Sequence, residues 1–314
     1  MNDRSQPARL TLSIAAVERD TGLSKDTLRV WERRYGFPNP ERDGGGSERA
    51  YPLEQVEKLR LVKRLMDAGH RPGRVVPLGL DALQQLADST GDAVTAPAAA
   101  PTWDEAAVQD YLALLRRHDL AALRQNLVLD LARYGLPQFL DGLVVPLNRA
   151  VGEAWLRGHV QVHEEHALTE MLQTVLRQAL AQLPAHGGQA QPRVLLSTLP
   201  GEPHGLGLLM VEAQLACAGA GCVSLGVQTP VWDLVLAAEA YHCDVVALGF
   251  SGSTNPNQTV EALIELRGKL PAATDLWVGG NAPVLQRRRI DGVQPMDDLA
   301  ALPAAVALWR ARHP

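Results

Sequence analysis

The sequence is poor in cysteine and in aromatic residues. Among 314 residues there are three cysteines, and aromatic side chains make up 4% of the chain. Cys217, Cys222 and Cys243 form no C-x-x-C pair. This pattern indicates incidental free thiols of a protein in a reducing cytosol.

The chain also lacks the common targeting and nucleotide-binding patterns. No apolar stretch is long enough to cross a bilayer, and the first ten residues are polar, so we expect neither a membrane span nor a signal peptide. Neither G-x-G-x-x-G nor a P-loop occurs, which disfavours the usual dinucleotide and phosphate sites of doubly wound proteins. We therefore expect a cytoplasmic protein without a membrane partner.

Charge is unevenly distributed along a chain that is long enough for two or three domains. The formal net charge is −5. Residues 1–75 hold 15 Lys and Arg against 11 Asp and Glu, a net charge of +4, and the remainder holds 15 against 24, a net charge of −9. A basic amino-terminal module on an acidic body permits a DNA-binding head attached to a sensor.

The amino-terminal module has the pattern of a helix-turn-helix. Residues 12–18 begin a short helix, Gly22 supplies a turn, and Ser24 is a good N-cap for a second helix over 25–34. A glycine-rich loop with Arg49 and Tyr51 follows, and another helix runs on to Gly69.

These residues resemble the winged-helix head of MerR-family transcription regulators over residues 11–75. The resemblance rests on the run from Leu28 to Pro38, the glycine wing, and the helix after it. The wing is one residue longer than usual and holds an extra acid, Glu48. The resemblance implies contacts with double-stranded promoter DNA, which we expect from Lys25, Arg29, Arg33, Arg34, Tyr35, Arg49 and Tyr51.

Residues 77–102 change in composition and are expected to form a flexible linker, since the stretch 88–101 is small, polar and contains proline. Leucine-rich stripes with helical spacing then predict a four-helix bundle over 103–188. Within this region His159, His163 and His166 are spaced i, i+4, i+7, so an unbroken helix would place them on one face. Zinc is a minor interpretation of these histidines, because glycine and valine weaken the helix and no fourth ligand is near.

From Arg193 onward strands and helices alternate, which predicts a parallel sheet with helices on both faces over residues 189–314. The four predicted strands are 194–197, 223–225, 245–249 and 276–279. The predicted fold is therefore multidomain α and α/β: a winged helix-turn-helix at 1–76, a bundle, and a Rossmann-like doubly wound sheet. After the first predicted strand of that sheet comes Glu202, then His204 and Gly207, at the edge where open α/β sheets bind ligands. Glu202 is placed to hold the second ring nitrogen of His204, and Gly207 lets a bulky ligand approach the backbone.

This spacing resembles the cobalamin-binding signature, in which the histidine becomes the lower axial ligand of cobalt and an Asp stands where this chain has Glu202. The resemblance extends to Ser251 or Ser253 as the hydroxyl that bonds the nucleotide tail, without a ranking of the two. It also extends to Gly279 and Gly280 as a slot for that tail.

The bundle carries a second resemblance. Trp155, nine intervening residues, and the pair Glu165-His166 look like the capping motif of light-responsive CarH/LitR-type MerR regulators. The resemblance implies that these three residues cover the upper face of adenosylcobalamin. Leu156 stands where some light sensors carry a histidine, which leaves a bis-histidine end state open.

Together these patterns predict a cobalamin-controlled transcriptional repressor that is not an enzyme and acts as a homo-oligomer, either dimer or tetramer. The absence of cysteine between residues 70 and 150 disfavours a thiol metal sensor. Two alternatives stay open. The first is a MerR-type regulator that has lost cobalamin and responds to another ligand or a partner protein. The second is a corrinoid carrier for methyl transfer, which the DNA-binding head disfavours.

Overall fold

A computed structural model describes residues 11–42, 49–67, 69–91, 105–183, 190–252 and 254–313. Most of the predicted wing and Ser253 therefore lie outside the described residues. The chain forms two compact units, the first made of residues 1–97 with 153–160 and the second of residues 98–152 with 161–314.

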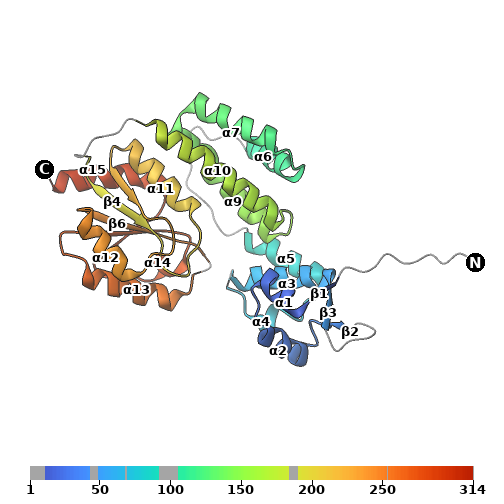
Figure 1. Cartoon of the computed structure of the whole chain (residues 1–314). Helices are drawn as coiled ribbons and strands as arrows, with labels where there is room; N and C mark the ends of the chain where they lie inside the picture. The colour runs from blue at the N-terminus through green and yellow to red at the C-terminus, as the bar shows by residue number, and fades with distance from the viewer. Residues whose placement is uncertain are drawn as a thin grey trace, which may run out of the picture. The chain divides into compact units, whose positions relative to one another are not determined.

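The first unit contains the predicted helix-turn-helix (Figure 1). Its first helix is capped by Ser13 and ends at Gly22, where φ is +70°, and its second is capped by Ser24 and ends at Gly36, where φ is +68°. The helices of this unit are α1 (Ile14–Thr21), α2 (Lys25–Tyr35), α3 (Leu53–Asp67), α4 (Pro72–Val75) and α5 (Leu80–Gly91). A small antiparallel sheet completes the unit, in the order β1 (Thr11–Ser13), β3 (Arg49–Pro52) and β2 (Glu41–Arg42).

Helix α5 corrects the prediction of a flexible linker over 77–102. Residues 80–91 are helical, and Leu83 is fully buried in the core of the first unit with Leu86 packed beside it. Leu80, Leu83 and Leu86 recur at three-residue spacing, which gives this segment one apolar side despite its polar composition. Apart from this segment, the predicted domain boundaries stay predictions.

The helical part of the second unit begins with α6 (Glu105–Arg116) and α7 (Leu120–Tyr134). It continues through α8 (Leu136–Phe139), a π-helical turn η1 (Leu140–Val144) and α9 (Val145–Leu156), and ends with α10 (Val162–Gln182). The interpretation of three histidines on one helical face is wrong for His159, because the chain turns at Gly158, where φ is +76°, and His159 lies between α9 and α10.

The second unit also contains a five-stranded parallel sheet, which confirms the predicted fold class (Figure 1). Its order is β5 (Gly221–Ser224), β4 (Arg193–Ser197), β6 (Val245–Phe250), β7 (Asp275–Gly280) and β8 (Val293–Met296). Four strands agree with the sequence prediction in place, and β8 is an additional edge strand.

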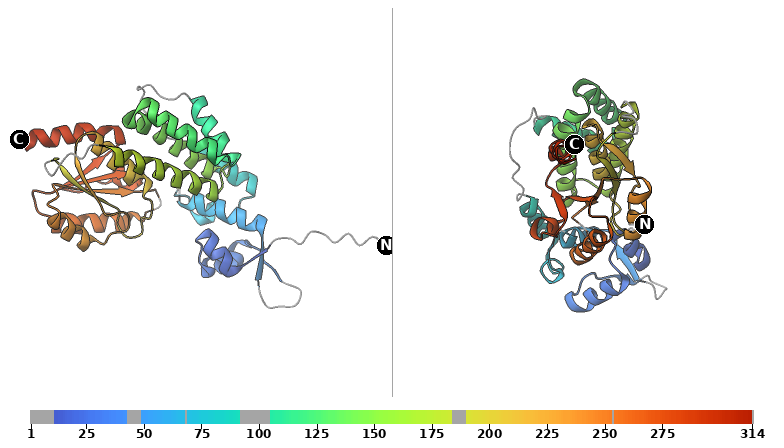
Figure 2. Two further views of the ribbon diagram at one scale, coloured as in Figure 1. Left: turned by 45° about the horizontal axis from the view of Figure 1, so that its top comes forward. Right: turned by 90° about the vertical axis from the view of Figure 1, so that its left-hand side faces the viewer.

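Helices cover both faces of this sheet (Figure 2). One apolar core joins the sheet to α11 (Leu206–Cys217) and α15 (Leu302–Arg312), and the other joins it to α12 (Val231–Ala240) and α13 (Pro256–Lys269). Two shorter helices, α14 (Pro283–Arg287) and η3 (Leu299–Ala301), follow β7 and β8. Helices α8 and α10 pack against α11, so the bundle is attached to the sheet through that helix.

No helix among the described residues is both long and apolar enough to cross a membrane.

Candidate functional site

The predicted ligand site lies where the strand order of the sheet reverses. Within this sheet β5 follows β4 in the chain and lies on one side of it, whereas β6, the next strand in the chain, lies on the other side. Loops leaving the carboxyl ends of β4 and β6 diverge at this point, which is where open α/β sheets bind ligands. Glu202 and His204 follow β4, and Ser251 follows β6.

Glu202 joins these two loops. Its side chain is 2% exposed, and one carboxylate oxygen accepts hydrogen bonds from the backbone N–H of His204 at 3.0 Å and from Nδ1 of the same histidine at 2.6 Å. The other oxygen accepts the backbone N–H of Ser251 at 2.5 Å. A carboxylate partner makes Nδ1 the protonated nitrogen, so Nε2 carries the free lone pair. The His204 side chain is 64% exposed.

The electrostatics of the pair agree with this geometry. Burial alone would raise the pKa of Glu202, but hydrogen bonds from His204 and from the side chain and backbone of Ser251 lower it to about 2. The hydrogen bond that Nδ1 of His204 donates to Glu202 raises the pKa of His204 despite partial burial, and the charges of Glu202 and then Glu165 raise it further.

Polar residues that the sequence reading missed brace the loop between β4 and α11. Thr198 is buried; its hydroxyl donates to the backbone oxygen of Glu202 at 2.6 Å and accepts the N–H of Gln228 at 2.8 Å. Ser197, also buried, bonds Thr229 at 2.7 Å. Two hydroxyl residues at the end of an apolar strand were the available signal, because a buried hydroxyl needs partners.

The glycines of the predicted site differ in what they do. A Cβ added at Gly207 would meet no atom within 4 Å, so this position leaves open space beside the start of α11. At Gly280 a Cβ would overlap the carbonyl of Phe250 on the neighbouring strand, and φ is +110°, so the fold itself requires glycine there; its role as a slot for the nucleotide tail stays a prediction. A Cβ at Gly279 would lie 3.4 Å from the backbone oxygen of Met296.

Glu165 and His166 lie in the first turns of α10. Oε1 of Glu165 accepts the hydroxyl of Thr169 at 2.8 Å, and Oε2 lies 3.4 Å from Nε2 of His166. The His166 side chain is 71% exposed. Both side chains are therefore held close together with the imidazole available to solvent, and their role as a ligand cap stays a prediction.

Trp155, the third predicted cap residue, packs within the first unit. The guanidinium carbon of Arg64, on α3, lies 4.4 Å from the centre of the indole ring, and Nη1 of Arg64 donates to the backbone oxygen of Trp155 at 2.5 Å. Arg64 is 6% exposed, and burial followed by repulsion from Arg60 lowers its pKa to about 10. The sequence reading missed Arg64, because a basic residue in the third helix of a DNA-binding head has no distinctive pattern.

The predicted DNA-contacting residues lie on α2 and β3. Arg29, Arg33 and Arg34 are exposed, and Lys25 and Tyr35 are half-buried. Arg29 forms an ion pair with Asp26 at 3.2 Å, and Lys25 forms one with Glu18 at 3.4 Å.

Tyr51 corrects one of these predictions. Its side chain is fully buried, so it is not placed to contact DNA, and its hydroxyl donates to Oε1 of Glu32 at 2.6 Å. Burial, and then the hydrogen bond to Glu32, raise the pKa of Tyr51. The other carboxylate oxygen of Glu32 lies 3.5 Å from Arg49, so Tyr51 helps to position the exposed Arg49.

A separate cavity of about 450 Å³ opens beside β7 and β8, lined by Val278, Leu285 and residues 288–295. None of the predicted site residues lines it.

Comparisons with known proteins match the head by itself and also most of the chain. Residues 12–76 match the model of the MerR HTH family regulatory proteins. Over 270 residues the chain is 32% identical to the HTH-type transcriptional repressor CarH of Myxococcus xanthus. This match covers 83% of this chain and 86% of the relative. The HTH-type transcriptional repressor CarA of the same organism is 32% identical over 263 residues and covers 81% of each chain.

Among solved structures, the monomethylamine corrinoid protein of Methanosarcina barkeri is similar with a TM-score of 0.51 and 15% identity. The match covers 63% of this chain and 96% of that protein. At this identity the likeness shows a shared fold.

Proposed function

The chain belongs to the family of HTH-type transcriptional repressors that includes CarH and CarA, and we propose that it represses transcription under the control of a bound cobalamin. The observation that carries the proposal is the hydrogen-bonded group of Glu202, His204 and Ser251 at the point where the strand order reverses. An imidazole fixed by a carboxylate, with its other nitrogen exposed, is suited to bind a metal centre.

The described residues fit such a ligand. His204 would be the lower cobalt ligand, and Glu202 would keep its tautomer and orientation. The open space at Gly207 leaves room for a large planar group near the backbone, and Ser251 supplies a polar group on the adjacent loop. Adenosylcobalamin, once bound, supplies a cobalt–carbon bond that light breaks.

Protein residues convert the state of the ligand into a change of DNA affinity. A ligand shifts an equilibrium only when it has different affinities for two conformations. Glu165 and His166 begin α10, and Trp155 ends α9, so a rearrangement of the cap would move the start of one helix and the end of another. Trp155 packs on Arg64 of the head within the first unit, so a rearrangement of Trp155 would be felt by α3.

The head would bind promoter DNA through α2 and the strand β3. The basic side chains of α2 suit the major groove and the phosphates beside it, and Arg49 suits a phosphate contact. Binding as a homo-oligomer in the dark and release in light complete the proposal, which the CarH/LitR-type resemblance supports.

The test uses the full chain, purified without cobalamin. We expect addition of adenosylcobalamin in the dark to give a coloured complex, and illumination to change its visible spectrum. Light should also reduce affinity for promoter DNA at one fixed salt concentration. His204→Ala should weaken cobalamin binding and alter the spectrum, whereas His242→Ala, at an exposed histidine on the surface, should do neither.

A protein that stays colourless with excess adenosylcobalamin overturns the cobalamin assignment. If such a protein still binds promoter DNA, it is a repressor that answers another ligand or a partner protein. If DNA affinity depends on cobalamin but not on light, ligand availability is the signal.

A further inference from the structure

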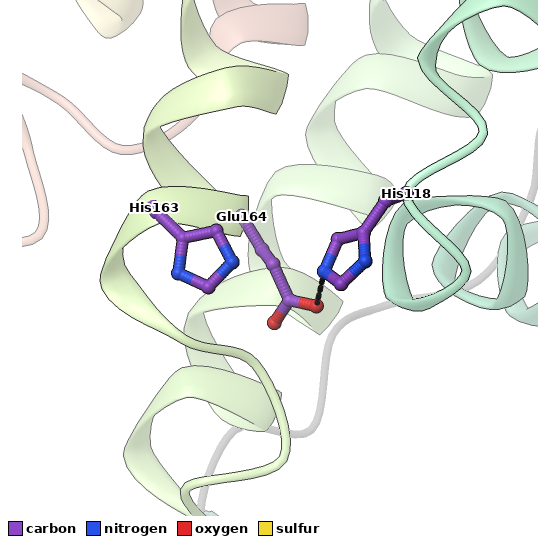
Figure 3. A group of neighbouring side chains, drawn as sticks. All are labelled: His118, His163 and Glu164. Atoms are coloured by element: carbon purple, nitrogen blue, oxygen red, sulfur yellow. Dashed lines mark ion pairs between the residues drawn. The ribbon is translucent and has the colours of Figure 1, made fainter.

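Three side chains from two separate parts of the second unit converge on the surface of the bundle (Figure 3). His118 lies in the turn between α6 and α7, and His163 and Glu164 lie in the first turn of α10. One imidazole nitrogen from each histidine and one carboxylate oxygen of Glu164 all lie within 4.8 Å of one another. The carboxylate stands between the two rings (Figure 3).

The carboxylate is fixed before any ion arrives. Glu164 is 8% exposed, and its Oε2 accepts the backbone N–H of Gln161 at 2.6 Å as part of a capping box. Its Oε1 lies 3.1 Å from Nε2 of His118. A buried carboxylate is stabilised by a cation in contact with it.

The two histidines are presented differently. His118 has φ of +57°, a left-handed conformation that is uncommon outside glycine, in the turn that precedes the N-cap Asp119. His163 is exposed at the second position of α10, and the two ring centres are 5.6 Å apart. Two exposed imidazoles beside a buried carboxylate thus face one volume open to solvent.

We propose that His118, His163 and Glu164 form a binding site for a divalent transition-metal ion such as Zn²⁺, with solvent completing the coordination. Zinc takes nitrogen and oxygen ligands at about 2.0–2.2 Å, so ligand atoms around a tetrahedral ion are about 3.4 Å apart. The His118–Glu164 distance already meets this requirement, and rotation of the exposed rings closes the rest. Two histidines and one carboxylate with open positions are a donor set that suits zinc and related ions.

Such an ion would join the α6–α7 turn to the start of α10. The first two turns of α10 also hold Glu165 and His166, so occupancy would restrain the part of the helix that carries these two proposed cap residues. The site differs from the zinc interpretation of the sequence: His163 takes part, His159 and His166 do not, and His118 comes from a distant part of the chain.

The test measures Zn²⁺ binding to the cobalamin-free full chain by competition with a chromogenic chelator and by the Zn²⁺-dependent rise in melting temperature. We expect one site in the wild type. His118→Asn and His163→Ala should each lower the affinity by at least the roughly 10- to 100-fold that loss of an orienting partner costs in metal sites. Asparagine tolerates the left-handed conformation, so His118→Asn should still fold.

His242→Asn is the matched control, because His242 is also exposed and has φ of +51°. It should bind Zn²⁺ like the wild type. Equal Zn²⁺ affinity in the wild type and in both site variants overturns the proposal, as does a wild type whose melting temperature does not respond to Zn²⁺. Circular dichroism without metal checks that each variant is folded. If His118→Asn does not fold, the Zn²⁺ affinity of His163→Ala tests the proposal.

Discussion

Glu202 is a buried carboxylate whose two oxygens serve two loops of the sheet. Its spacing from His204 predicts the pairing with the imidazole, and the 2.6 Å hydrogen bond confirms it. The bond to Ser251 was not predictable from the sequence, because it joins residues far apart in the chain through the order of the strands. At this scale the sequence predicts local partners, and the fold decides the distant ones.

Glu202→Gln should destabilise the α/β sheet even without a ligand. The substitution replaces a carboxylate that accepts three hydrogen bonds with a neutral amide. The NH₂ group of the amide then faces another donor, either the backbone N–H of Ser251 or the N–H groups of His204. Hydrogen bonds to charged groups contribute about 1.5–3 kcal/mol each, so we expect a loss of about that size in the free energy of unfolding. Urea denaturation followed by circular dichroism measures it.

Glu265→Gln is the control, since Glu265 is exposed on α13 and pairs with Lys269 across one helical turn. Its effect should stay within about 0.5 kcal/mol, as for most surface substitutions. Equal stability of the Glu202 and Glu265 variants would mean that the buried group does not hold the two loops together.

The pair also predicts a pH dependence. The pKa of Glu202 is lowered from 4.5 to about 2, so its stabilisation is complete above pH 4.5 and is lost as the pH falls toward 2. The pKa of His204 is raised above 6.5, so its stabilisation is complete below 6.5 and is lost as the pH rises through the raised value. The difference in melting temperature between wild type and Glu202→Gln should therefore shrink both when the pH falls toward 2 and when it rises through the raised pKa of His204. A difference that is constant with pH contradicts the assignment.

Among the elements, the helix-turn-helix and four strands of the parallel sheet agree with their sequence patterns, because caps, glycine turns and buried apolar runs are local signals. Two of the elements that the sequence analysis did not predict, α5 and β8, have clear physical explanations. In α5 the buried Leu83 outweighs a polar composition, since tertiary packing stabilises a short helix. Strand β8 is four residues long and contains Pro295, which is tolerated at a sheet edge but weakens the sequence signal.

Strand β3 carries a prediction about DNA. Arg49 is exposed at its start and paired with Glu32 of α2, which is itself held by the hydroxyl of Tyr51. Arg49→Ala should weaken binding to all promoter sequences alike and reduce the slope of log affinity against log salt by about 1, as expected for one phosphate contact. Fluorescence anisotropy over a salt series measures both quantities.

Arg116→Ala, at an exposed arginine on α6, should leave the salt slope unchanged. Should the two variants share one slope, Arg49 does not contact phosphate. Should Arg49→Ala change the sequence preference instead, Arg49 reads bases.

For the whole molecule, the proposed function requires a ligand at His204, in the second unit, to change the DNA affinity of the head, in the first unit. Helix α9 contributes to both units, because residues up to Gly152 belong to the second and residues from Glu153 belong to the first. Trp155 lies at this end of the helix, beneath the guanidinium of Arg64 from α3. The cap motif would assign the same indole to the ligand, and we propose that the ligand acts on the head through Trp155.

Arg64→Ala should therefore uncouple DNA binding from the ligand. In the wild type we expect cobalamin to change DNA affinity by the roughly 5- to 150-fold that is typical of coupled sites. In Arg64→Ala the ratio should fall to about twofold or less, with cobalamin still bound, because the contact that links α3 to Trp155 is gone. Lys63→Ala is the matched control, since Lys63 lies next in sequence on α3 and pairs with Asp67. An unchanged ratio in Arg64→Ala means that coupling runs through other contacts, whereas a wild-type ratio of one removes the cobalamin proposal itself.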